Sequence, residues 1–299
     1  MTHRAAILAC ARDEAATIAE WLAWHRAVGF GHVFLYCNDD DPAALFDAVR
    51  PFLGGPEPFV TFHHYPVQGE QFQMYLHGLA RYRRDAEWIA FLDIDEFLVP
   101  RGGGTLDDLL DEVPPNQGCL LLNWAMFGTG GHPAPPAGSV AASYTRRAAR
   151  VSATTKTLTR SACIDLGNID RRIYFWHGWE GTLAGGAASR GVLGLPPEAM
   201  ASDGSFLTDA AMSDAILRRA VVHHYAFRSE AALRQRIARG LGGDFHGQAM
   251  WQRVLDEGTT AAEMAVFNAV EDRFLADACA ARRSRAIAAG ALLPQPGWP

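Results

Sequence analysis

The sequence predicts an α/β protein with a mostly parallel central sheet flanked by helices and a C-terminal helical extension. Short apolar runs alternate with helical patterns through about the first 125 residues, and continuous apolar runs of this length are typical of buried parallel strands. Repeated strand, helix, strand order indicates right-handed crossovers that place helices on both faces of the sheet. Because 49% of the 299 residues are hydrophobic, the chain can bury a sizeable core.

Each element of this prediction follows from periodicity and from the residues at its ends. The predicted strands are Ala5–Cys10, His32–Tyr36, Phe59–Phe62, Trp88–Leu92 and Cys119–Trp124. The predicted helices between them are Ala15–Val28, Ala43–Arg50, Gln71–Arg84 and one capped by Thr105. The first helix carries an apolar stripe at three- and four-residue spacing and ends at Gly29.

The second half of the chain is less regular. Residues 130–150 and 178–205 are rich in Gly, Pro, Ala and Ser, and long loops of this kind in a compact enzyme tend to be functional. Further predicted elements are a helix at 209–219, a strand at 220–224, a helix capped by Ser229 that runs to residue 239, and a helix at 260–289. We therefore expect a main domain at 1–245 and a helical extension at 246–299.

The composition excludes several classes of function. The chain has 27 basic and 33 acidic residues and a formal net charge of −6, so it offers no overall field for nucleic acid or an anionic membrane. No apolar run is long enough for a transmembrane segment, and we expect a cytoplasmic protein. The five cysteines form no C-x-x-C pair, which argues against disulfides and a thiolate zinc site. We interpret Cys10, Cys37 and Cys119 as small buried side chains.

The strongest local signal is the acidic segment Asp93-Ile94-Asp95-Glu96. It follows a predicted buried strand, and in open α/β sheets ligands bind at the carboxyl ends of strands. If the segment is extended, Asp93 and Asp95 point to one side and can share a hard cation such as Mn²⁺ or Mg²⁺. The alternative is a solvated acidic turn. Hydrophobic segments on both sides favour the metal site.

A second polar segment, Arg12-Asp13-Glu14, lies at the end of the first predicted strand and ahead of a helix. This is a usual position for a nucleotide. The segment has no glycine-rich phosphate loop, which argues against a dinucleotide dehydrogenase or a P-loop enzyme. As an alternative, Asp13 and Glu14 are acids of the first helical turn that complement the helix dipole.

Seven motifs, taken in order, resemble glycosyltransferase family 92, as a bacterial member related to family 2 enzymes with the GT-A fold. They are RDEAATIAEWLAWHRAVGF, the turn from Asn38 to Asp41, Gln71, WIAFLDIDEFL, NWAMFGTGGH, KTLTR, and HHYAFRS with Arg239-Gly240. The resemblance covers roughly residues 5–245. Three positions depart from the family pattern: Asp13 replaces Asn, the turn after the second strand is altered, and Arg228 replaces Lys.

The resemblance implies a GT-A-like nucleotide-diphospho-sugar transferase at 1–245 that moves a hexose from a UDP- or GDP-linked donor to a glycan or another hydroxyl acceptor, with inversion. It implies a metal site in which Asp95 is a direct ligand, Asp93 binds the ribose or the metal through water, and His224 completes the shell. Lys156 and Arg160 share one face if their segment is a strand, and could bind phosphate oxygens; the alternative is a solvent-exposed basic face. The donor-binding candidates are Arg12, Asp13, Glu14, Asn38, Gln71, Asp93, Lys156 and Arg160.

The acceptor site and the general base are less defined. Trp124, Phe127 and the loop from Gly128 could form an aromatic platform for a sugar, although Trp124 could equally pack in the core. The candidates for the base are Glu96, Asp165, Asp170 and Glu180. Two other functions stay open: a metal-dependent phosphoester hydrolase that uses His63-His64, and a sugar-nucleotide-binding protein without turnover.

Overall fold

The computed structural model describes residues 3–170, 172, 174–179, 183–238, 252–254, 256–258 and 260–288. The chain forms two compact units, one of residues 1–124 and 150–222 and the other of residues 125–149 and 223–299. The predicted domain boundary near residue 245 and the motif residues Arg239-Gly240 lie outside the described residues. Each unit is described by itself.

A mostly parallel sheet forms the centre of the first unit, with the strand order β3-β2-β1-β4-β8-β6-β10-β5 and β9 paired to β6. Its strands are β1 (His3–Ala11), β2 (His32–Cys37), β3 (Val60–His64), β4 (Ala86–Phe91), β5 (Glu96–Pro100), β6 (Gln117–Met126), β8 (Thr155–Arg160), β9 (Ala188–Gly191) and β10 (Ala220–His224). Strands β1 to β4 are mutually parallel, whereas β8 runs antiparallel to both β4 and β6. The predicted α/β class and the five predicted strands are confirmed.

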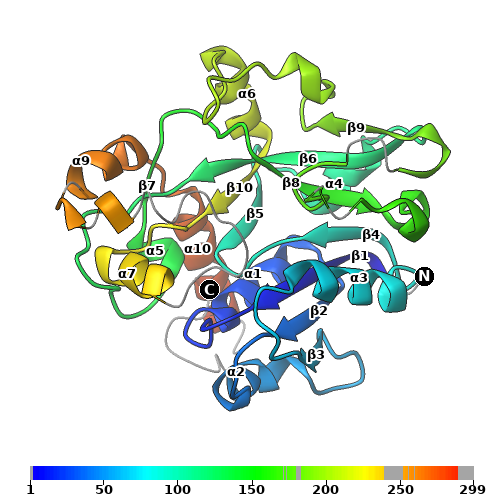
Figure 1. Ribbon diagram of the computed structural model, residues 1–299, viewed down its shortest axis with the longest axis horizontal. Helices are drawn as coiled ribbons and strands as arrows, with labels where there is room; N and C mark the ends of the chain where they lie inside the picture. Colours follow the sequence, from blue (N-terminus) through cyan, green and yellow to red (C-terminus); the bar gives the residue numbers. More distant parts are fainter. Residues whose placement is uncertain are drawn as a thin grey trace. The chain divides into compact units, whose positions relative to one another are not determined.

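Three helices connect the parallel strands (Figure 1): α1 (Ile18–Val28), α2 (Ala43–Val49) and α3 (Gln71–Tyr82). The chain passes from β1 to β2 to β3 in one direction and then returns through α3 to β4 beside β1. Because the crossovers are right-handed, α1 and α2 cover one face and α3 covers the other. Met74, Tyr75 and Leu79 of α3 pack on Leu8 and Phe34, so this face is core.

Strand β5 was not predicted as a separate element, and α1 accounts for its position. The Trp21 Nε1–H donates a hydrogen bond to the Glu96 carbonyl oxygen at 2.7 Å, and the Trp24 Nε1–H donates to the Leu98 carbonyl oxygen at 2.8 Å. The Leu98 N–H donates to His25 Nε2 at 3.2 Å. The aromatic residues of the first helix therefore fix the strand that begins at the acidic segment.

The remaining elements of the first unit are short. Helix α4 (Leu106–Asp111) begins with the predicted cap, where Thr105 Oγ1 accepts from Asp108 N and the Asp108 carboxylate accepts from Thr105 N. Helix α6 (Ala210–Arg219) is capped by Asp209 and leads into β10. The 3-10 helices are η1 (Arg50–Phe52), η2 (Ser161–Cys163), η3 (Leu166–Asn168), η4 (Ala184–Gly186) and η5 (Pro197–Ala199).

The second unit contains α5 (Val140–Ser143), β7 (Arg146–Arg147), α7 (Glu230–Ala238), α9 (Thr260–Met264), η6 (Val266–Asn268), β11 (Val270–Glu271) and α10 (Phe274–Ala288). The prediction of one helix over 260–289 is wrong, because β11 pairs antiparallel with β7 and interrupts it. A buried ion pair between Arg147 Nε and Asp272 Oδ2, at 2.7 Å, stabilises the interruption. Ser229 caps α7 as expected.

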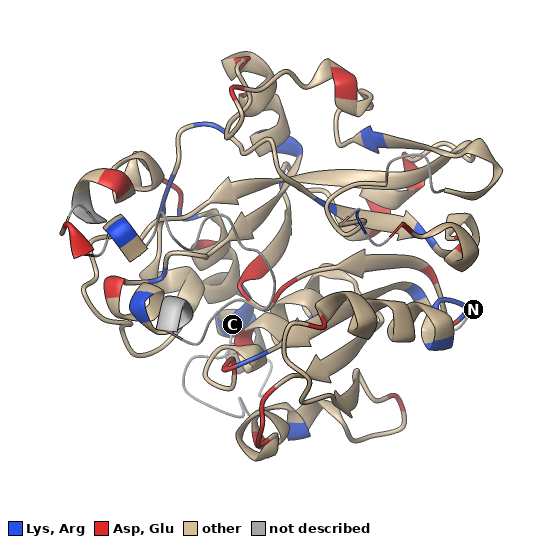
Figure 2. Ribbon diagram, in the orientation of Figure 1, with Lys and Arg blue, Asp and Glu red and all other residues tan. Residues whose placement is uncertain are grey.

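Two further expectations concern the surface and the cysteines. Acidic and basic segments are interspersed along the described ribbon (Figure 2). Cys37 and Cys119 are buried, Cys10 is half-buried, and all five cysteines are free.

None of the helices in the described residues combines the length and the apolar character needed to cross a membrane.

Candidate active site

The acidic segment lies where β4 ends, at the carboxyl edge of the parallel strands. Asp93 follows this strand after one residue, and Glu96 opens β5. The Asp93 N–H donates to Glu96 Oε2 at 3.0 Å, and the Glu96 N–H donates to the Asp93 carbonyl oxygen at 3.1 Å. The segment is therefore a tight turn closed on itself, and α1 holds its far end in place.

Three side chains from two other elements converge on the Asp93 carboxylate. Gln71 Nε2 donates to its Oδ1 at 2.8 Å, and the Tyr75 hydroxyl donates to the same oxygen at 3.5 Å. Lys156 Nζ donates to its Oδ2 at 2.7 Å. Burial alone would raise the pKa of Asp93, but the charge and hydrogen bond of Lys156 outweigh it, so the pKa is lowered and the carboxylate is ionised.

Glu96 lies deeper than Asp93. Its side chain is inaccessible to solvent, and its Oε2 is 3.1 Å from Lys156 Nζ. Burial raises the pKa of Glu96 well above its ordinary value, against the opposing effect of Lys156. Burial would lower the pKa of Lys156, yet the two carboxylates raise it, so the ammonium stays protonated.

The residues of the first unit fit a divalent cation. Asp95, which precedes Glu96 in the sequence, is 8% exposed, and carboxylate oxygens are the donors that Mn²⁺ and Mg²⁺ prefer. Because burial raises the pKa of Glu96 and favours its neutral form, Asp93 and Asp95 are the acidic side chains that would meet the positive charge of an M²⁺ ion. His224 belongs to the second unit, and its role as a further ligand stays a prediction.

The residues at the ends of β1 and β2 form a second polar group. Arg12 Nη1 donates to the Asn38 carbonyl oxygen at 2.6 Å, and the Asp13 N–H donates to Asp39 Oδ1 at 2.7 Å. Asp13 has a φ of 57° and is the only non-glycine with positive φ among the residues that the structure describes. Asp and Asn adopt this region more readily than most residues, so an aspartate suits this position.

Asn38 and Glu14 have structural partners in this region. The Asn38 Nδ2 group donates to the carbonyl oxygens of Tyr65 and Val67 at 2.7 and 2.8 Å, which ties the end of β2 to the segment after β3. Glu14 Oε2 accepts from Thr17 Oγ1 at 2.6 Å just before α1. These contacts shape the edge of the sheet on which a nucleotide was predicted.

Lys156 and Arg160 both lie on β8, but the structure does not bring them to one site. The Arg160 guanidinium contacts Glu87 Oε1 at 3.2 Å, donates to the carbonyl oxygens of Gln117 and Val113, and stacks over Trp88 with its Cζ 4.2 Å from the ring centroid. Four residues of strand place it roughly 13 Å along β8 from Lys156. Phosphate binding by Arg160 stays a prediction.

The acceptor candidates differ in accessibility. Trp124 is half-buried, with its ring 6.0 Å from Lys156 Nζ and 5.2 Å from the His177 ring. Phe127 is 1% exposed and packs on His223 and Tyr225 in the second unit. A Cβ atom at Gly128 would come within 2.4 Å of Asn268 Oδ1, so the backbone is closely packed there. Of the three, Trp124 is the most accessible.

The candidate bases other than Glu96 are held by their own loops. Asp165 caps η3 and accepts from Gly167 N at 3.0 Å and Asn168 Nδ2 at 2.8 Å. Asp170 pairs with Arg172 at 2.7 Å, and these hydrogen bonds lower its pKa to about 2. Glu180 lies outside the described residues.

Two side chains near Asp93 were not predicted. Tyr75 is buried and lies four residues after Gln71 on α3, so the helical i, i+4 relation was the signal that could have found it. His177, whose charge lowers the pKa of Asp93 as a minor contribution, donates from Nδ1 to the Thr155 carbonyl oxygen at 2.8 Å. It lies in an irregular segment, where the sequence gives no such signal.

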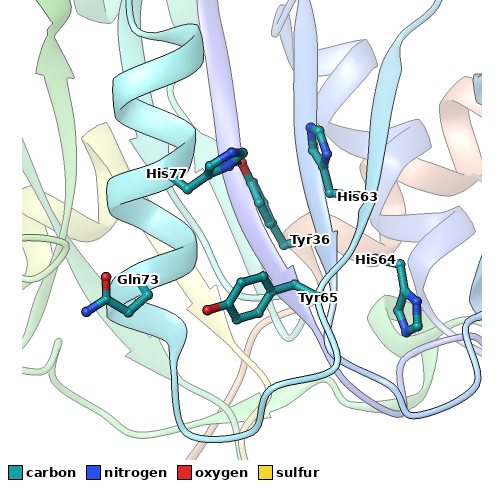
Figure 3. A pocket seen from close by; sticks show the side chains of 6 residues that line it. All are labelled: Tyr36, His63, His64, Tyr65, Gln73 and His77. Carbon is teal, nitrogen blue, oxygen red and sulfur yellow. Dashed lines mark hydrogen bonds between the residues drawn. The ribbon is translucent and has the colours of Figure 1, made fainter.

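A separate cavity of about 400 Å³ lies between α3 and the strands β2 and β3 (Figure 3). The Tyr36 hydroxyl points to His77 and bonds to its Nδ1 at 2.6 Å, and His63 Nε2 bonds to the Tyr82 hydroxyl at 2.6 Å. His64 points away and bonds to the Asp39 carbonyl oxygen. Neither histidine of the His63-His64 pair therefore bonds to Asp93, and nothing in this arrangement favours a phosphoester hydrolase.

Comparison of the sequence with known proteins matches the chain to a known family. A family model described as glycosyltransferase family 92 matches residues 7–165. A glycosyltransferase family 92 protein of rice, Oryza sativa subsp. japonica, is 31% identical over 149 residues, which cover 49% of this chain and 25% of that protein. A family 92 protein of Ricinus communis is 27% identical over 148 residues, covering 48% and 26%. The chain thus spans about a quarter of the length of the curated relatives it matches.

Among solved structures, residues 1–349 of S. aureus TarS in complex with UDP are 15% identical, with a TM-score of 0.35, and the match covers 54% of this chain and 47% of that one. The two curated relatives are plant proteins, and the bacterial origin expected from the sequence is not confirmed by them. The family match contains Asp93, Asp95 and Lys156 and ends before His224. The chain belongs to glycosyltransferase family 92.

Proposed function

We propose that the chain is a glycosyltransferase that moves a hexose from a UDP- or GDP-linked donor to a hydroxyl of a glycan or another acceptor, with inversion. The observation that carries this proposal is the convergence of Gln71, Tyr75 and Lys156 on Asp93 at the carboxyl end of β4. The convergence lies inside the family match. Ligands of open α/β sheets bind at this edge.

Asp95 would hold a divalent cation directly, with Asp93 as a ligand through water or as the partner of the ribose and His224 as a third ligand. A bound Mn²⁺ or Mg²⁺ supplies Lewis-acid stabilisation of the leaving diphosphate. The ionised Asp93 carboxylate, with Asp95 two residues further along the chain, supports the binding of one such ion. The GT-A-like fold implied by the resemblance is part of this proposal.

The donor would lie along the edge formed by the ends of β1, β2 and β4. Arg12, Asp13 and Asn38 fix the loops on the far side of this edge from Asp93. Gln71 connects these loops to Asp93. It begins α3 just after the segment that Asn38 bonds through Val67, and its side chain donates to Asp93. A nucleotide placed there would have its diphosphate near the acidic segment.

The acceptor hydroxyl must lose a proton to a base as it attacks the donor sugar. The side chain of Glu96 is inaccessible to solvent and bound to Lys156, which argues against this role. Asp165 and Asp170, the other candidates from the sequence, are already bonded within their own turns, so the proposal assigns the base to neither of them. Trp124 is the proposed platform for the acceptor sugar.

The test is nucleotide release from a panel of UDP- and GDP-sugars, with and without Mn²⁺, by the wild-type chain and by Asp95→Asn. We expect Mn²⁺-dependent release with at least one donor, and a loss on the order of 100-fold in the variant. Asp47→Asn is the matched control, because Asp47 is an exposed acid on α2 in the same unit. Its release rate should equal that of the wild type.

Three outcomes would contradict the proposal. Nucleotide binding without release for every donor would favour a sugar-nucleotide-binding protein, and metal-dependent cleavage of p-nitrophenyl phosphate would favour a hydrolase. Equal rates for wild type and Asp95→Asn would remove the acidic segment from the mechanism.

A further inference from the structure

Lys156 is the only lysine in the 299-residue sequence, although the chain has 27 basic residues. The structure buries it completely, in the middle of β8. A guanidinium is larger and planar, whereas an ammonium is a compact point charge on a flexible stem. A chain that otherwise uses arginine thus has lysine at the one place where a small cation lies between two carboxylates.

The position of Lys156 follows from the sheet register. Leu158 of β8 pairs with Ala90 of β4, and Lys156 pairs with Leu122 of β6. Because β8 runs antiparallel to β4, Lys156 lies two residues beyond this pair, beside the turn where β4 gives way to the acidic segment. From this position its Nζ reaches Asp93 and Glu96.

The two carboxylates that it contacts differ in exposure. The Asp93 side chain is 32% exposed, whereas the side chains of Glu96 and Lys156 are both inaccessible to solvent. A ligand that arrives at this edge can therefore meet Asp93 but cannot meet Lys156 in this arrangement. The sequence pattern alone had suggested direct phosphate contact for this residue.

Asp93 is oriented by donors on both of its oxygens. Its Oδ1 accepts from Gln71 and Tyr75, and its Oδ2 accepts from Lys156. An ionised carboxylate offers about four lone-pair sites, so these three donors fix the plane of the group and leave little freedom to rotate. Removing Lys156 would release Oδ2 and leave the ionised Asp93 carboxylate without its ammonium partner.

We propose that Lys156 is a positioning residue, which holds the Asp93 carboxylate from behind in the orientation that meets the ribose or the water on the metal ion, without touching the donor itself. This inference rests on the proposed function, which it deepens. It assigns to Lys156 the role that partners of ligand-bearing carboxylates have in metal sites, where their loss typically costs 10- to 100-fold in affinity or activity.

The first experiment uses the single lysine as its own probe. The wild-type protein is treated with an amine-reactive acetylating reagent, and modification of Lys156 is followed by peptide mass spectrometry, which separates it from the N-terminal amine. We expect no modification in the folded protein, with or without UDP and Mn²⁺, and full modification after unfolding. Reaction in the folded protein that UDP and Mn²⁺ suppress would show that Lys156 contacts the donor, and would overturn the proposal.

The second experiment is a double-mutant cycle in a Glu96→Gln background, which removes one carboxylate charge so that Lys156→Met leaves only Asp93 without its partner. We expect Lys156→Met to slow nucleotide release about 10- to 100-fold. In the presence of Asp93→Ala it should have little further effect, because the group that it positions is gone. Thermal melting of each variant verifies folding, and Lys156→Arg tests whether any cation suffices.

If the losses caused by Lys156→Met and by Asp93→Ala multiply in the variant that carries both, Lys156 acts independently of Asp93. That result would overturn the proposal. Failure of the proposed function gives a different result, namely no nucleotide release by the wild-type chain. The labelling experiment would still report the accessibility of Lys156 in that case, so the two failures can be distinguished.

Discussion

Two acidic segments of the first unit, residues 93–96 and residues 165–170, hold their carboxylates by different means. Asp93 receives donors that are 18, 22 and 63 residues away along the chain. Asp165 and Asp170 receive theirs from residues two or three positions away. The first carboxylate depends on the folded sheet for its environment, and the second pair depends on local turns.

This difference shows which acidic residues are oriented by the tertiary structure and which by local turns. A local turn such as the one at Asp165 forms wherever an Asp side chain meets a nearby backbone N–H. A carboxylate that collects an amide, a phenol and an ammonium from two separate elements requires the helix, the strand and their packing together. Such preorganised groups are the ones that catalysis and binding use.

The largest expected effect comes from breaking the convergent site. Asp93→Asn should reduce nucleotide release on the order of 100-fold, because the amide can no longer carry the charge that Lys156 and Gln71 hold in place. Asp165→Asn should change the rate by less than about 3-fold, since its carboxylate serves its own turn. The measurement is steady-state nucleotide release with saturating Mn²⁺ and donor.

A comparable loss in both variants would break the comparison. It would identify the locally bonded Asp165 as the general base. It would also show that hydrogen-bond donors distant in the sequence do not mark the functional carboxylates of this chain. A loss in Asp170→Asn alone would point to the other candidate in the same way.

The sequence predicted the parts of the site that depend on local pattern. The strand before Asp93, the helix from Gln71 and the acidic segment itself all follow from periodicity and residue type. The pairing of Lys156 with Asp93 and Glu96 could not be predicted, because it depends on β8 lying between β4 and β6, antiparallel to both. Strand β5 was missed because its five residues follow the turn directly, and the contacts that fix it, its place at the edge of the sheet and the indole hydrogen bonds from α1, are distant in the sequence.

The same reasoning accounts for the break in the C-terminal helix. Helical periodicity continues through residues 260–289, but Asp272 forms a buried pair with Arg147, which is 125 positions earlier. A local pattern carries no information on a partner that distant. Tertiary contacts therefore override helix propensity at β11.

A smaller effect should appear where α1 supports the acidic segment. His25 is fully buried and donates from Nδ1 to the Trp21 carbonyl oxygen at 2.9 Å, while its Nε2 accepts from Leu98 N. Only the neutral Nδ1–H tautomer satisfies both bonds, and burial lowers the pKa of His25 to about 3. The unfolded imidazole binds a proton near pH 6.5, so stability is present above that pH and falls as the pH drops towards 3.

Between pH 8 and pH 5 this linkage should cost about 2 kcal/mol of the free energy of unfolding. The measurement is urea unfolding at both pH values for wild type and His25→Gln, whose amide can donate and accept as the neutral ring does. The variant should lose about 2 kcal/mol less than wild type over this interval. His32, whose pKa is also lowered, to about 4, contributes equally to both proteins and cancels. Identical pH dependence would mean that His25 is not the titrating group.

The smallest expected effect belongs to the local segment. Asp170 accepts from the backbone and guanidinium of Arg172, which is 89% exposed, and exposed ion pairs contribute little because water and salt screen them. Arg172→Gln should leave the melting temperature within error of wild type at both low and high salt. It should raise the pKa of Asp170, which can be measured by NMR titration. A clear loss of thermal stability would show that the 165–170 segment also contributes to the stability of the fold. The two acidic segments would then differ only in how far away in the sequence their hydrogen-bond donors lie.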